Sequence, residues 1–514
     1  MLAKVLSFGL HGIDGYPVLV EADVYNGLPG YELVGLPDAA VKESKERIRS
    51  AIKNSGYEYP AKRITINLAP ADQKKEGPLY DLAMAAGILA ASEQVLPELL
   101  RYMVIFGELS LNGDVRAVSG ILPMVIEARK RGFNLVVVPH ENAKEASYIS
   151  DVKVLPVRHL KELAEILNKE RKPAFYEAAE WRKKEGGNAA LVDLKDIKGQ
   201  QKAKRAMEIA AAGGHNILMI GSAGTGKSML AKALPGILPD LTFEEMLEVT
   251  KIHSVAGELK KNHGELISTR PFRNPHHTAS YAAITGGGQK TMPGEISLAH
   301  RGVLYFDELP EFKRDVLEAL RQPLEDRTIS ISRVNSKVSY PADIMFVASM
   351  NPCPCGNYGS PDLACRCTPP QISRYLNRIS GPLLSRIDIQ VEMSNIKYDD
   401  MVSVEEQETS ADVKKRVDAA RARQVVRYKE LGLYCNAQLT SADIKKYCNT
   451  DEAAERTLKE AFNAMKLSAR AYTRVLLTAR TIADLDEEEK VLEPHVLEAV
   501  QYRTLDRKYW GQGL

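Results

Sequence analysis

Near the middle of the chain, glycine, lysine and serine follow the spacing G-x-x-x-x-G-K-[ST], beginning at Gly221 and ending at Ser228. Glycines let backbone N–H groups converge on phosphate oxygens, and a helix N-terminus adds partial positive charge. In such a loop the Lys227 amine reaches the β and γ phosphates, and the Ser228 hydroxyl ligates Mg²⁺. We therefore expect a site for ATP and Mg²⁺. The residues expected to bind the nucleotide are Gly221, Ser222, Ala223, Gly224, Thr225, Gly226, Lys227, Ser228 and Met229.

The segments on either side of this loop are of the kind that the motif requires. The short apolar run 216–220 predicts a strand, and 229–234 is rich in helix-forming residues. Strand, glycine loop and helix is the arrangement of a phosphate-binding loop. This context favours a bound nucleotide over the alternative, a glycine turn without a ligand.

A pair of acids follows about 80 residues later, where the apolar run 302–306 ends in Asp307 and Glu308. Asp307 is placed to hold the Mg²⁺ shell, and Glu308 to orient and deprotonate the attacking water. Phosphoryl transfer needs mainly positioning and charge neutralisation, which this pair supplies. Taken alone, such a pair is also compatible with a surface turn. After a phosphate-binding loop, it predicts ATP hydrolysis.

Another predicted strand, 344–350, ends in the amide Asn351. We expect this strand to lie between the loop strand and the acidic strand in a parallel sheet. There, Asn351 is able to hydrogen-bond the γ-phosphate or its attacking water. The alternative role for Asn351 is a helix cap or a turn.

Two arginines complete the expected catalytic set. Arg386 lies where a predicted helix enters a strand, and we expect it at a subunit edge, neutralising transition-state charge on a neighbour's nucleotide. The alternative for Arg386 is a local pair with Asp388. Arg470, near the start of a later helix, is a candidate sensor of the γ-phosphate. Arg474 competes for that role, and a structural salt bridge is the alternative.

Composition places the chain among ordinary globular proteins. It has 514 residues, 44% hydrophobic and 26% charged, with a net charge of +2. This small net charge does not indicate a nucleic-acid partner, so any DNA-binding surface must be a local patch. No apolar run approaches the roughly 18 residues of a membrane span, and the N-terminus does not resemble a signal peptide. We expect a cytoplasmic protein with no membrane partner.

Beyond these motifs, the chain resembles the ComM/YifB family of magnesium-chelatase-like AAA+ ATPases. The matching stretches are 27–30, 34–44, 67–72, 270–278 and 351–356. The resemblance implies a homohexameric ring that acts on branched or single-stranded DNA, as a branch-migration helicase in recombination and natural transformation. Two positions depart from the family pattern. Ala223 stands where proline is usual, and Ser385 stands where the family often has aspartate.

The expected architecture is α/β with three parts. Residues 1–168 resemble the Lon-protease fold, an α+β relative of S5-like domains, and 169–190 read as a charged linker. Residues 191–395 are expected to form a P-loop AAA+ core on a parallel sheet. Residues 396–514 are expected to form a helical lid of the magnesium-chelatase C-terminal type. The helical periodicity there covers 413–431, 441–448, 452–465, 470–485 and 493–503.

The front domain lacks the Ser-Lys dyad of the protease that it resembles. Leu79 stands at the position of the nucleophile, and Leu122 at the position of the base. Without a hydroxyl and an amine no acyl transfer proceeds, so we exclude proteolysis. The domain is instead expected to assist oligomerisation or DNA contact.

Four cysteines have the spacing of a metal site. Cys353-x-Cys355 and Cys365-x-Cys367 flank a short loop that contains glycine, and four thiolates suit tetrahedral Zn²⁺. Reduced free thiols are the alternative. Because Cys353 follows Asn351 by two residues, a structural zinc ion would brace the predicted γ-phosphate sensor.

Two basic inserts are candidates for DNA contact. Segment 251–300 contains Arg273 and Lys290, and segment 328–340 alternates like a hairpin that carries Arg333 and Lys337. The resemblance implies that both inserts point into the channel of a ring, where basic side chains meet backbone phosphates. The alternative is a solvated loop and hairpin.

The sequence is also compatible with two other functions. One is the motor of a chelatase that inserts Mg²⁺ into a tetrapyrrole. The Lon-like front domain and the four-cysteine loop argue against it. The other is a nucleotide-gated scaffold that regulates a partner.

Overall fold

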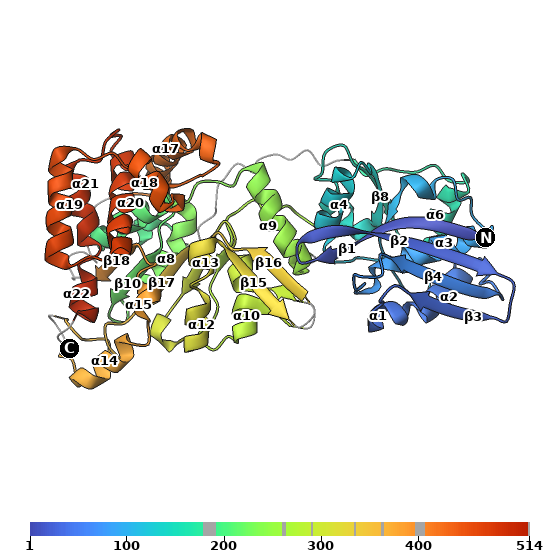
Figure 1. Ribbon diagram of the computed structural model, residues 1–514, viewed down its shortest axis with the longest axis horizontal. Coiled ribbons are helices and arrows are strands. Elements are labelled where there is room, and N and C mark those ends of the chain that lie inside the picture. Colours follow the sequence, from blue (N-terminus) through green and yellow to red (C-terminus); the bar gives the residue numbers. More distant parts are fainter. Residues whose placement is uncertain are drawn as a thin grey trace. The chain divides into compact units, whose positions relative to one another are not determined.

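A computed structural model describes residues 1–177, 192–259, 264–288, 291–333, 336–360, 364–395 and 407–511 (Figure 1). Within it the chain forms two compact units. Unit 1 comprises Met1–Lys183 and Met246–Ile267, and unit 2 comprises Lys184–Glu245 and Ser268–Leu514. Part of the predicted linker, 178–190, and the first part of the predicted lid, 396–406, lie outside the described residues.

Unit 1 is built on a 7-stranded mixed sheet of order β3-β4-β2-β1-β5-β8-β9. Along β2, buried side chains alternate with partly exposed ones, because successive residues of a strand point to opposite faces. The strands are β1 (Leu2–His11), β2 (Asp14–Tyr25), β3 (Gly30–Val34), β4 (Arg63–Ala69), β5 (Val104–Ile105), β8 (Leu135–Pro139) and β9 (Lys153–Val157). A small hairpin of β6 (Glu108–Leu109) and β7 (Val115–Arg116) lies outside this sheet.

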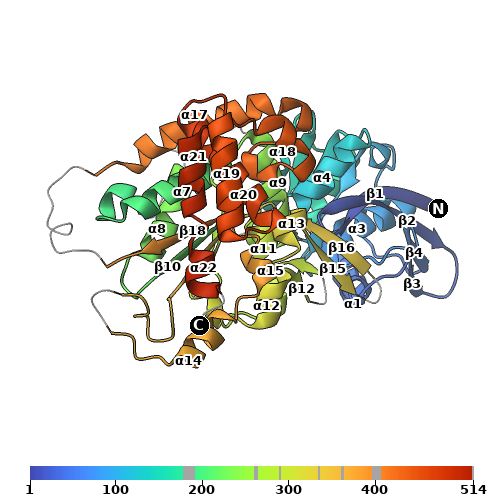
Figure 2. The same cartoon turned by 60° about the vertical axis from the view of Figure 1, so that its left-hand side comes forward.

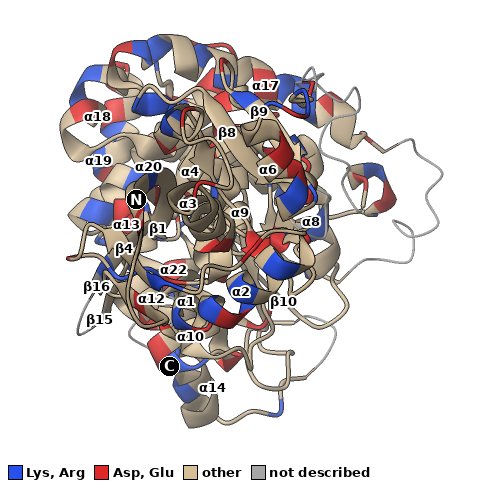
Figure 3. Cartoon of the chain, turned by 90° about the vertical axis from the view of Figure 1, so that its right-hand side faces the viewer, with Lys and Arg blue, Asp and Glu red and all other residues tan. Residues whose placement is uncertain are grey.

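Helices complete the core of unit 1. Helix α3 (Asp81–Ala91) is buried along its whole length, as its run of alanine and aliphatic residues requires. The others are α1 (Ala39–Lys42), α2 (Ser44–Asn54), α4 (Ile121–Lys130), α5 (Ala143–Ala146) and α6 (Leu160–Leu167). Basic residues outnumber the single acidic residue, Glu46, along α2, whereas α6 carries one lysine and two glutamates (Figure 3).

Unit 2 contains a 5-stranded sheet of order β11-β14-β17-β10-β18 in which every neighbouring pair is parallel. Strands β10 (Ile217–Gly221), β14 (Val303–Phe306) and β17 (Met345–Met350) are entirely buried. The outer strands are β11 (Phe272–Arg273) and β18 (Ile389–Met393). As predicted, β17 lies between the loop strand β10 and the acidic strand β14. The parallel sheet therefore confirms the predicted α/β class.

Further helices of unit 2 flank these strands in the sequence. They are α7 (Gln201–Gly213), α8 (Lys227–Ala233), α10 (Tyr281–Thr285), α11 (Glu295–Leu298), α12 (Arg314–Ala319), α13 (Pro323–Asp326), α14 (Pro369–Leu376) and α15 (Gly381–Leu384). Helix α9 (Phe243–Val255) belongs to unit 1 from Met246 onward. The second basic insert is an antiparallel hairpin, as predicted, formed by β15 (Thr328–Arg333) and β16 (Ser336–Pro341). A further short pair joins β12 (Gly286–Gly287) to β13 (Met292–Pro293).

The C-terminal part of unit 2 is helical (Figure 2). Its helices are α17 (Ser410–Arg427), α18 (Ser441–Tyr447), α19 (Glu452–Met465), α20 (Ala469–Leu485), α21 (Glu493–Gln501) and α22 (Leu505–Trp510). The predicted helix 452–465 coincides with α19, whereas the predicted 413–431 ends earlier, at Arg427. Among the described residues, no helix is both long and apolar enough to cross a membrane.

Candidate functional site

The predicted phosphate-binding loop joins β10 to α8. Gly224 and Gly226 have φ values of 82° and 92°, a left-handed backbone that favours glycine. A Cβ atom at Gly221 would lie 2.5 Å from the carbonyl oxygen of Met393, so that position requires glycine for space. Helix α8 begins at Lys227, immediately after the loop, which directs its N-terminal N–H groups toward a bound anion.

Lys227 is buried, and the loop itself satisfies its ammonium group. Its Nζ donates to the carbonyl oxygens of Gly221 (2.6 Å) and Ser222 (2.7 Å), and to Oδ1 of Asn351 (3.3 Å). Burial lowers the pKa of Lys227, while the charges of Asp307 and Glu308 act in the opposite direction. Because Asn351 accepts through Oδ1, its Nδ2 is the end able to donate to a phosphate oxygen. The predicted sensor and the predicted phosphate-binding lysine are therefore direct neighbours.

The predicted magnesium ligands also meet. Ser228 Oγ donates to Asp307 Oδ2 over 3.0 Å. Two hydroxyls that sequence reasoning did not single out complete the network. Tyr305 OH lies 3.0 Å from Ser349 Oγ and 3.3 Å from Ser228 Oγ, and Ser349 Oγ donates to Asp307 Oδ1.

This network keeps Asp307 ionised. Burial opposes ionisation, but hydrogen bonds from Ser349, Ser228 and Tyr305 outweigh it and hold the pKa of Asp307 below its ordinary value. A hydrogen bond to a charged group contributes about 1.5–3 kcal/mol. The carboxylate is thus charged and oriented before a divalent cation arrives.

Glu308 is the more accessible of the two acids. Its side chain is 57% exposed, and its Oε2 lies 3.9 Å from Nδ1 of His277. The backbone of Glu308 has φ 54°, a left-handed conformation that is uncommon for a residue with a side chain. Uncommon backbone conformations of this kind cluster at functional sites. An exposed carboxylate beside the half-buried Asp307, the predicted magnesium ligand, suits the predicted role of activating water.

Arg386, the predicted arginine finger that acts on a neighbour's nucleotide, and Arg470, the predicted γ-phosphate sensor, both have partners within their own chain. Arg386 donates through Nη2 to Glu325 and through Nη1 to the Pro382 carbonyl (2.8 Å). The alternative pairing of Arg386 with Asp388 does not occur. Asp388 instead binds Nε of Arg474 at 3.1 Å. Arg470 donates to the other oxygen of Glu325 at 2.5 Å.

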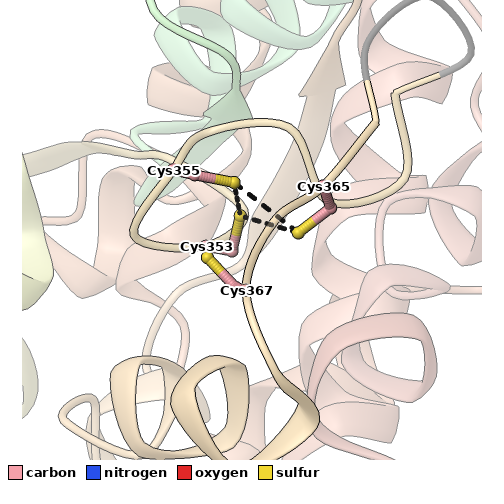
Figure 4. A group of neighbouring side chains, drawn as sticks. All are labelled: Cys353, Cys355, Cys365 and Cys367. Carbon is pink, nitrogen blue, oxygen red and sulfur yellow. Dashed lines mark hydrogen bonds between the residues drawn. The ribbon is translucent and has the colours of Figure 1, made fainter.

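The four cysteines converge from two stretches of one loop (Figure 4). Their Sγ atoms all lie within 4.8 Å of one another, and Cys353 is 3.4 Å from Cys355 and 3.7 Å from Cys365. Tetrahedral zinc with Zn–S bonds of about 2.3 Å separates its sulfurs by about 3.8 Å. Hydrogen bonds, first from the backbone N–H of Arg366, lower the pKa of Cys355 to about 6, whereas burial raises the pKa of Cys367. Donor type and spacing both fit Zn²⁺.

The cysteine loop also contacts the phosphate-binding loop. Ser222 Oγ donates to the carbonyl oxygen of Gly356 over 2.7 Å, across 134 residues of sequence. Asn351 and Cys353 lie two residues apart on the same segment. A metal ion held by the cysteines would therefore brace both the sensor and one side of the phosphate-binding loop.

The residues predicted to contact DNA differ in their surroundings. Arg273 binds Glu295 with both Nε (2.6 Å) and Nη2 (2.8 Å), which neutralises its charge within unit 2. This pairing weakens the case for a phosphate contact by Arg273, which stays a prediction. Lys337 is exposed on β16, and Arg333 ends β15. Lys290 lies outside the described residues.

In unit 1, the two leucines that are predicted to replace a protease dyad lie in the interior. Leu79 and Leu122 are buried, at 8% and 0% exposure. Neither position offers a nucleophile or a base.

Sequence reasoning missed several supporting residues, although a signal existed for two of them. Tyr305 precedes Asp307 by two residues, and Ser349 precedes Asn351 by two, so strand periodicity puts each pair on one face. A hydroxyl inside an otherwise apolar buried strand is the signal. Gln200 carried no such signal. Its Nε2 donates to the carbonyl oxygens of Thr225 (3.2 Å) and Ser394 (2.6 Å).

We predict that Ser349→Ala raises the Mg²⁺ concentration for half-maximal ATP hydrolysis on the order of tenfold, because one charge-assisted hydrogen bond to Asp307 is lost. The maximal rate at saturating Mg²⁺ should change little. Steady-state hydrolysis over a Mg²⁺ titration measures both quantities. Ser373→Ala, which removes a serine hydroxyl that bonds only Asn377 among the described contacts, is the control. An unchanged Mg²⁺ requirement would contradict the proposed network.

We also predict that the purified protein carries about one zinc ion per chain, and that the double variant Cys365→Ser, Cys367→Ser loses it. Loss of the metal should raise the KM for ATP several-fold, because Gly356 no longer holds Ser222. Elemental analysis and steady-state kinetics measure the two effects. Re-addition of zinc should rescue chelator-treated wild type and not the variant. If wild-type protein purified from cells grown in zinc-supplemented medium contains no zinc, the zinc assignment is wrong.

Comparison with protein-family models covers most of the chain. The model described as magnesium chelatase, subunit ChlI, matches residues 193–401, and the model for the C-terminal part of that subunit matches 407–503. A third model, subunit ChlI of Mg-chelatase, matches 20–142. The first of these models spans β10, β14, β17, Arg386 and the four cysteines, and the C-terminal model contains Arg470 and Arg474.

Full-length relatives agree with these models. The uncharacterized protein YifB of Salmonella typhimurium is 45% identical over 514 residues, covering 98% of both chains. The competence protein ComM of Haemophilus influenzae is 44% identical over 509 residues, again 98% of both chains. A shorter match joins this chain to the Lon protease of Trichlorobacter lovleyi, at 24% identity over 166 residues, 30% of this chain and 20% of that protein. The chain therefore belongs to the ComM/YifB family of magnesium-chelatase-like AAA+ ATPases.

Proposed function

We propose that this protein is a Mg²⁺-dependent, ring-forming ATPase that moves along branched or single-stranded DNA, as a branch-migration helicase in recombination. The observation that carries the ATPase half is the convergence of Lys227, Asn351, Asp307 and Ser228 at one edge of the parallel sheet. Glu308 stands beside them as the base for the attacking water. We assign ATP and Mg²⁺ to this edge.

The ring is proposed from the position of Arg386. Within the described residues its guanidinium contacts Pro382 and Glu325, and no residue of the phosphate-binding loop. A catalytic arginine that does not serve its own nucleotide is expected to serve a neighbour's. Assembly as a homohexamer completes this arrangement.

The DNA half of the proposal has two supports. One is the name of the relative ComM, a competence protein, which is similar along 98% of both chains. The other is the β15–β16 hairpin, which carries Arg333 and Lys337 and belongs to the same unit as the ATP site. Basic side chains at a hairpin tip suit contact with backbone phosphates.

A second candidate is the motor of a chelatase that inserts Mg²⁺ into a tetrapyrrole, which the descriptions of the three family models favour. The Lon-like matches and the four-cysteine loop argue against it. The two candidates differ in what stimulates ATP hydrolysis. DNA is expected to stimulate a helicase, whereas a chelatase motor requires tetrapyrrole and partner subunits.

We predict that four-way-junction or single-stranded DNA raises the ATPase rate several-fold over protein alone, and that protoporphyrin does not. Glu308→Gln should bind ATP and show no turnover, because the base is lost while charge at the phosphates changes little. A coupled ATPase assay and a fluorescent-nucleotide binding assay measure these outcomes. Measurable steady-state turnover by Glu308→Gln would refute the choice of base.

The contact with DNA has its own control. Lys337→Gln should weaken DNA stimulation and lower its salt dependence, whereas Lys459→Gln, at an exposed lysine on α19, should behave like wild type. Equal stimulation in both variants would remove the hairpin from the proposal. Stimulation by porphyrin and not by DNA would favour the chelatase motor. Nucleotide binding without any hydrolysis would favour a nucleotide-gated scaffold.

Subunit sharing of the ATP site yields a separate prediction. Arg386→Ala and Glu308→Gln should each be inactive, but an equal mixture should recover about a quarter of the wild-type rate, because random mixing leaves some interfaces with both groups intact. ATPase assays after mixing and reassembly measure the recovery.

The control for this mixing experiment is Arg386→Ala combined with the double variant Arg386→Ala, Glu308→Gln. That mixture contains no interface with both groups, so it should stay inactive. A strictly monomeric wild type that hydrolyses ATP at full rate would refute the shared site.

A further inference from the structure

Three charged side chains from separate elements of unit 2 meet at one carboxylate. Glu325 lies on α13, Arg386 follows α15, and Arg470 lies on α20. Figure 2 shows these helices close together in unit 2. Arg386 binds Oε2 of Glu325 across 61 residues of sequence, and Arg470 binds Oε1 at 2.5 Å across 145 residues. Each oxygen of Glu325 thus holds a different guanidinium, and the two held arginines are those predicted to act on ATP.

The charges of this cluster do not balance. Two guanidinium groups face one carboxylate, which leaves a net positive charge for a further anion. The hydrogen bond from Arg386 lowers the pKa of Glu325, and the charge of Arg470 acts in the same direction, so Glu325 is ionised at neutral pH. Arg386 also has a buried Nε without a hydrogen-bond partner among the described residues.

Burial differs sharply across the cluster. The Arg386 side chain is only 10% exposed, whereas that of Glu325 is 47% exposed. The carboxylate is therefore on the solvent side and the finger arginine is retracted behind it. Arg386 cannot reach a neighbour's phosphate while it is held there. Glu325 is able to rotate into water at little cost, because it is already half solvated.

The neighbouring ion pair of Arg474 with Asp388 is a structural contact with which the Glu325 contacts can be compared. Arg474, one turn after Arg470 on α20, binds Asp388, whose side chain is 1% exposed. Breaking a buried pair leaves an uncompensated charge and is strongly destabilising. The Glu325 pairs differ because their carboxylate is half exposed, so an anion that replaces it at the arginines releases Glu325 into water. The Asp388 pair thus suits a permanent anchor for α20, and the Glu325 pairs suit contacts that an anion is able to exchange.

We propose that Glu325 is an internal substitute for the γ-phosphate. It holds Arg386 and Arg470 together and retracted in the unassembled chain, until the triphosphate on a neighbouring subunit competes for both arginines. The carboxylate thereby suppresses ATP hydrolysis outside the ring. This inference rests on the proposed function, since it requires a ring in which one subunit supplies arginines to the nucleotide of the next.

The test compares Glu325→Gln with Asp326→Asn. Both remove one negative charge from adjacent exposed positions of α13, but no contact joins Asp326 to either arginine among the described residues. In Glu325→Gln, the KM for ATP and the protein concentration for half-maximal activity should each fall on the order of tenfold, because a competing charge-assisted contact is lost. The maximal rate should change less than about twofold. Asp326→Asn should match wild type.

Assembly provides a readout besides turnover. With a non-hydrolysable ATP analogue, sedimentation should show Glu325→Gln assembling at lower protein concentration than wild type, and the double variant Glu325→Gln, Arg386→Ala should lose that gain. Equal assembly and equal KM for Glu325→Gln and wild type would overturn this inference and leave the proposed function intact. So would a large fall in maximal rate, which indicates a positioning role. A wild type that never assembles with nucleotide would overturn both.

Discussion

The parallel pairing of β10, β17 and β14 is the constraint on which the nucleotide site depends. Parallel strands bring their carboxyl ends to one edge of the sheet. Residues that follow these strands, Lys227, Asn351 and Asp307, are therefore neighbours although the chain separates them by as many as 124 residues. A slip of one residue in β14 would turn Tyr305 and Asp307 to the opposite face and dissolve the network. The buried apolar faces of the three strands prevent that slip.

Around this edge, contacts from outside the motifs orient the reactive groups before any ligand binds. Hydroxyls of Tyr305 and Ser349 hold Asp307, and the carbonyl oxygen of Gly356 holds Ser222. Dipoles and charges arranged in advance need little reorganisation when charge develops on a phosphate. The cysteine loop contributes to this arrangement because it fixes the segment that carries Gly356.

The arginines obey a different physical rule, in which burial separates permanent pairs from exchangeable ones. Asp388 is buried and keeps Arg474, because a buried charge without its partner is costly. Glu325 is half exposed and holds Arg386 and Arg470 through contacts that water or a phosphate is able to replace. The contacts of Glu325 with the two arginines at the predicted subunit edge are therefore exchangeable. The contact of Asp388 with Arg474, which attaches α20, is permanent.

The sequence by itself determined the phosphate-binding loop, the acidic pair and the strand that ends in Asn351, because each is a local pattern of residue type and period. It also determined helix 452–465, whose apolar spacing and N-terminal Asp451 are local signals. Only the tertiary structure decided which charges pair. Glu325 takes Arg386 and Asp388 takes Arg474 across long stretches of chain. No local period encodes such partners, because they are selected by packing and by the cost of leaving a buried charge unpaired.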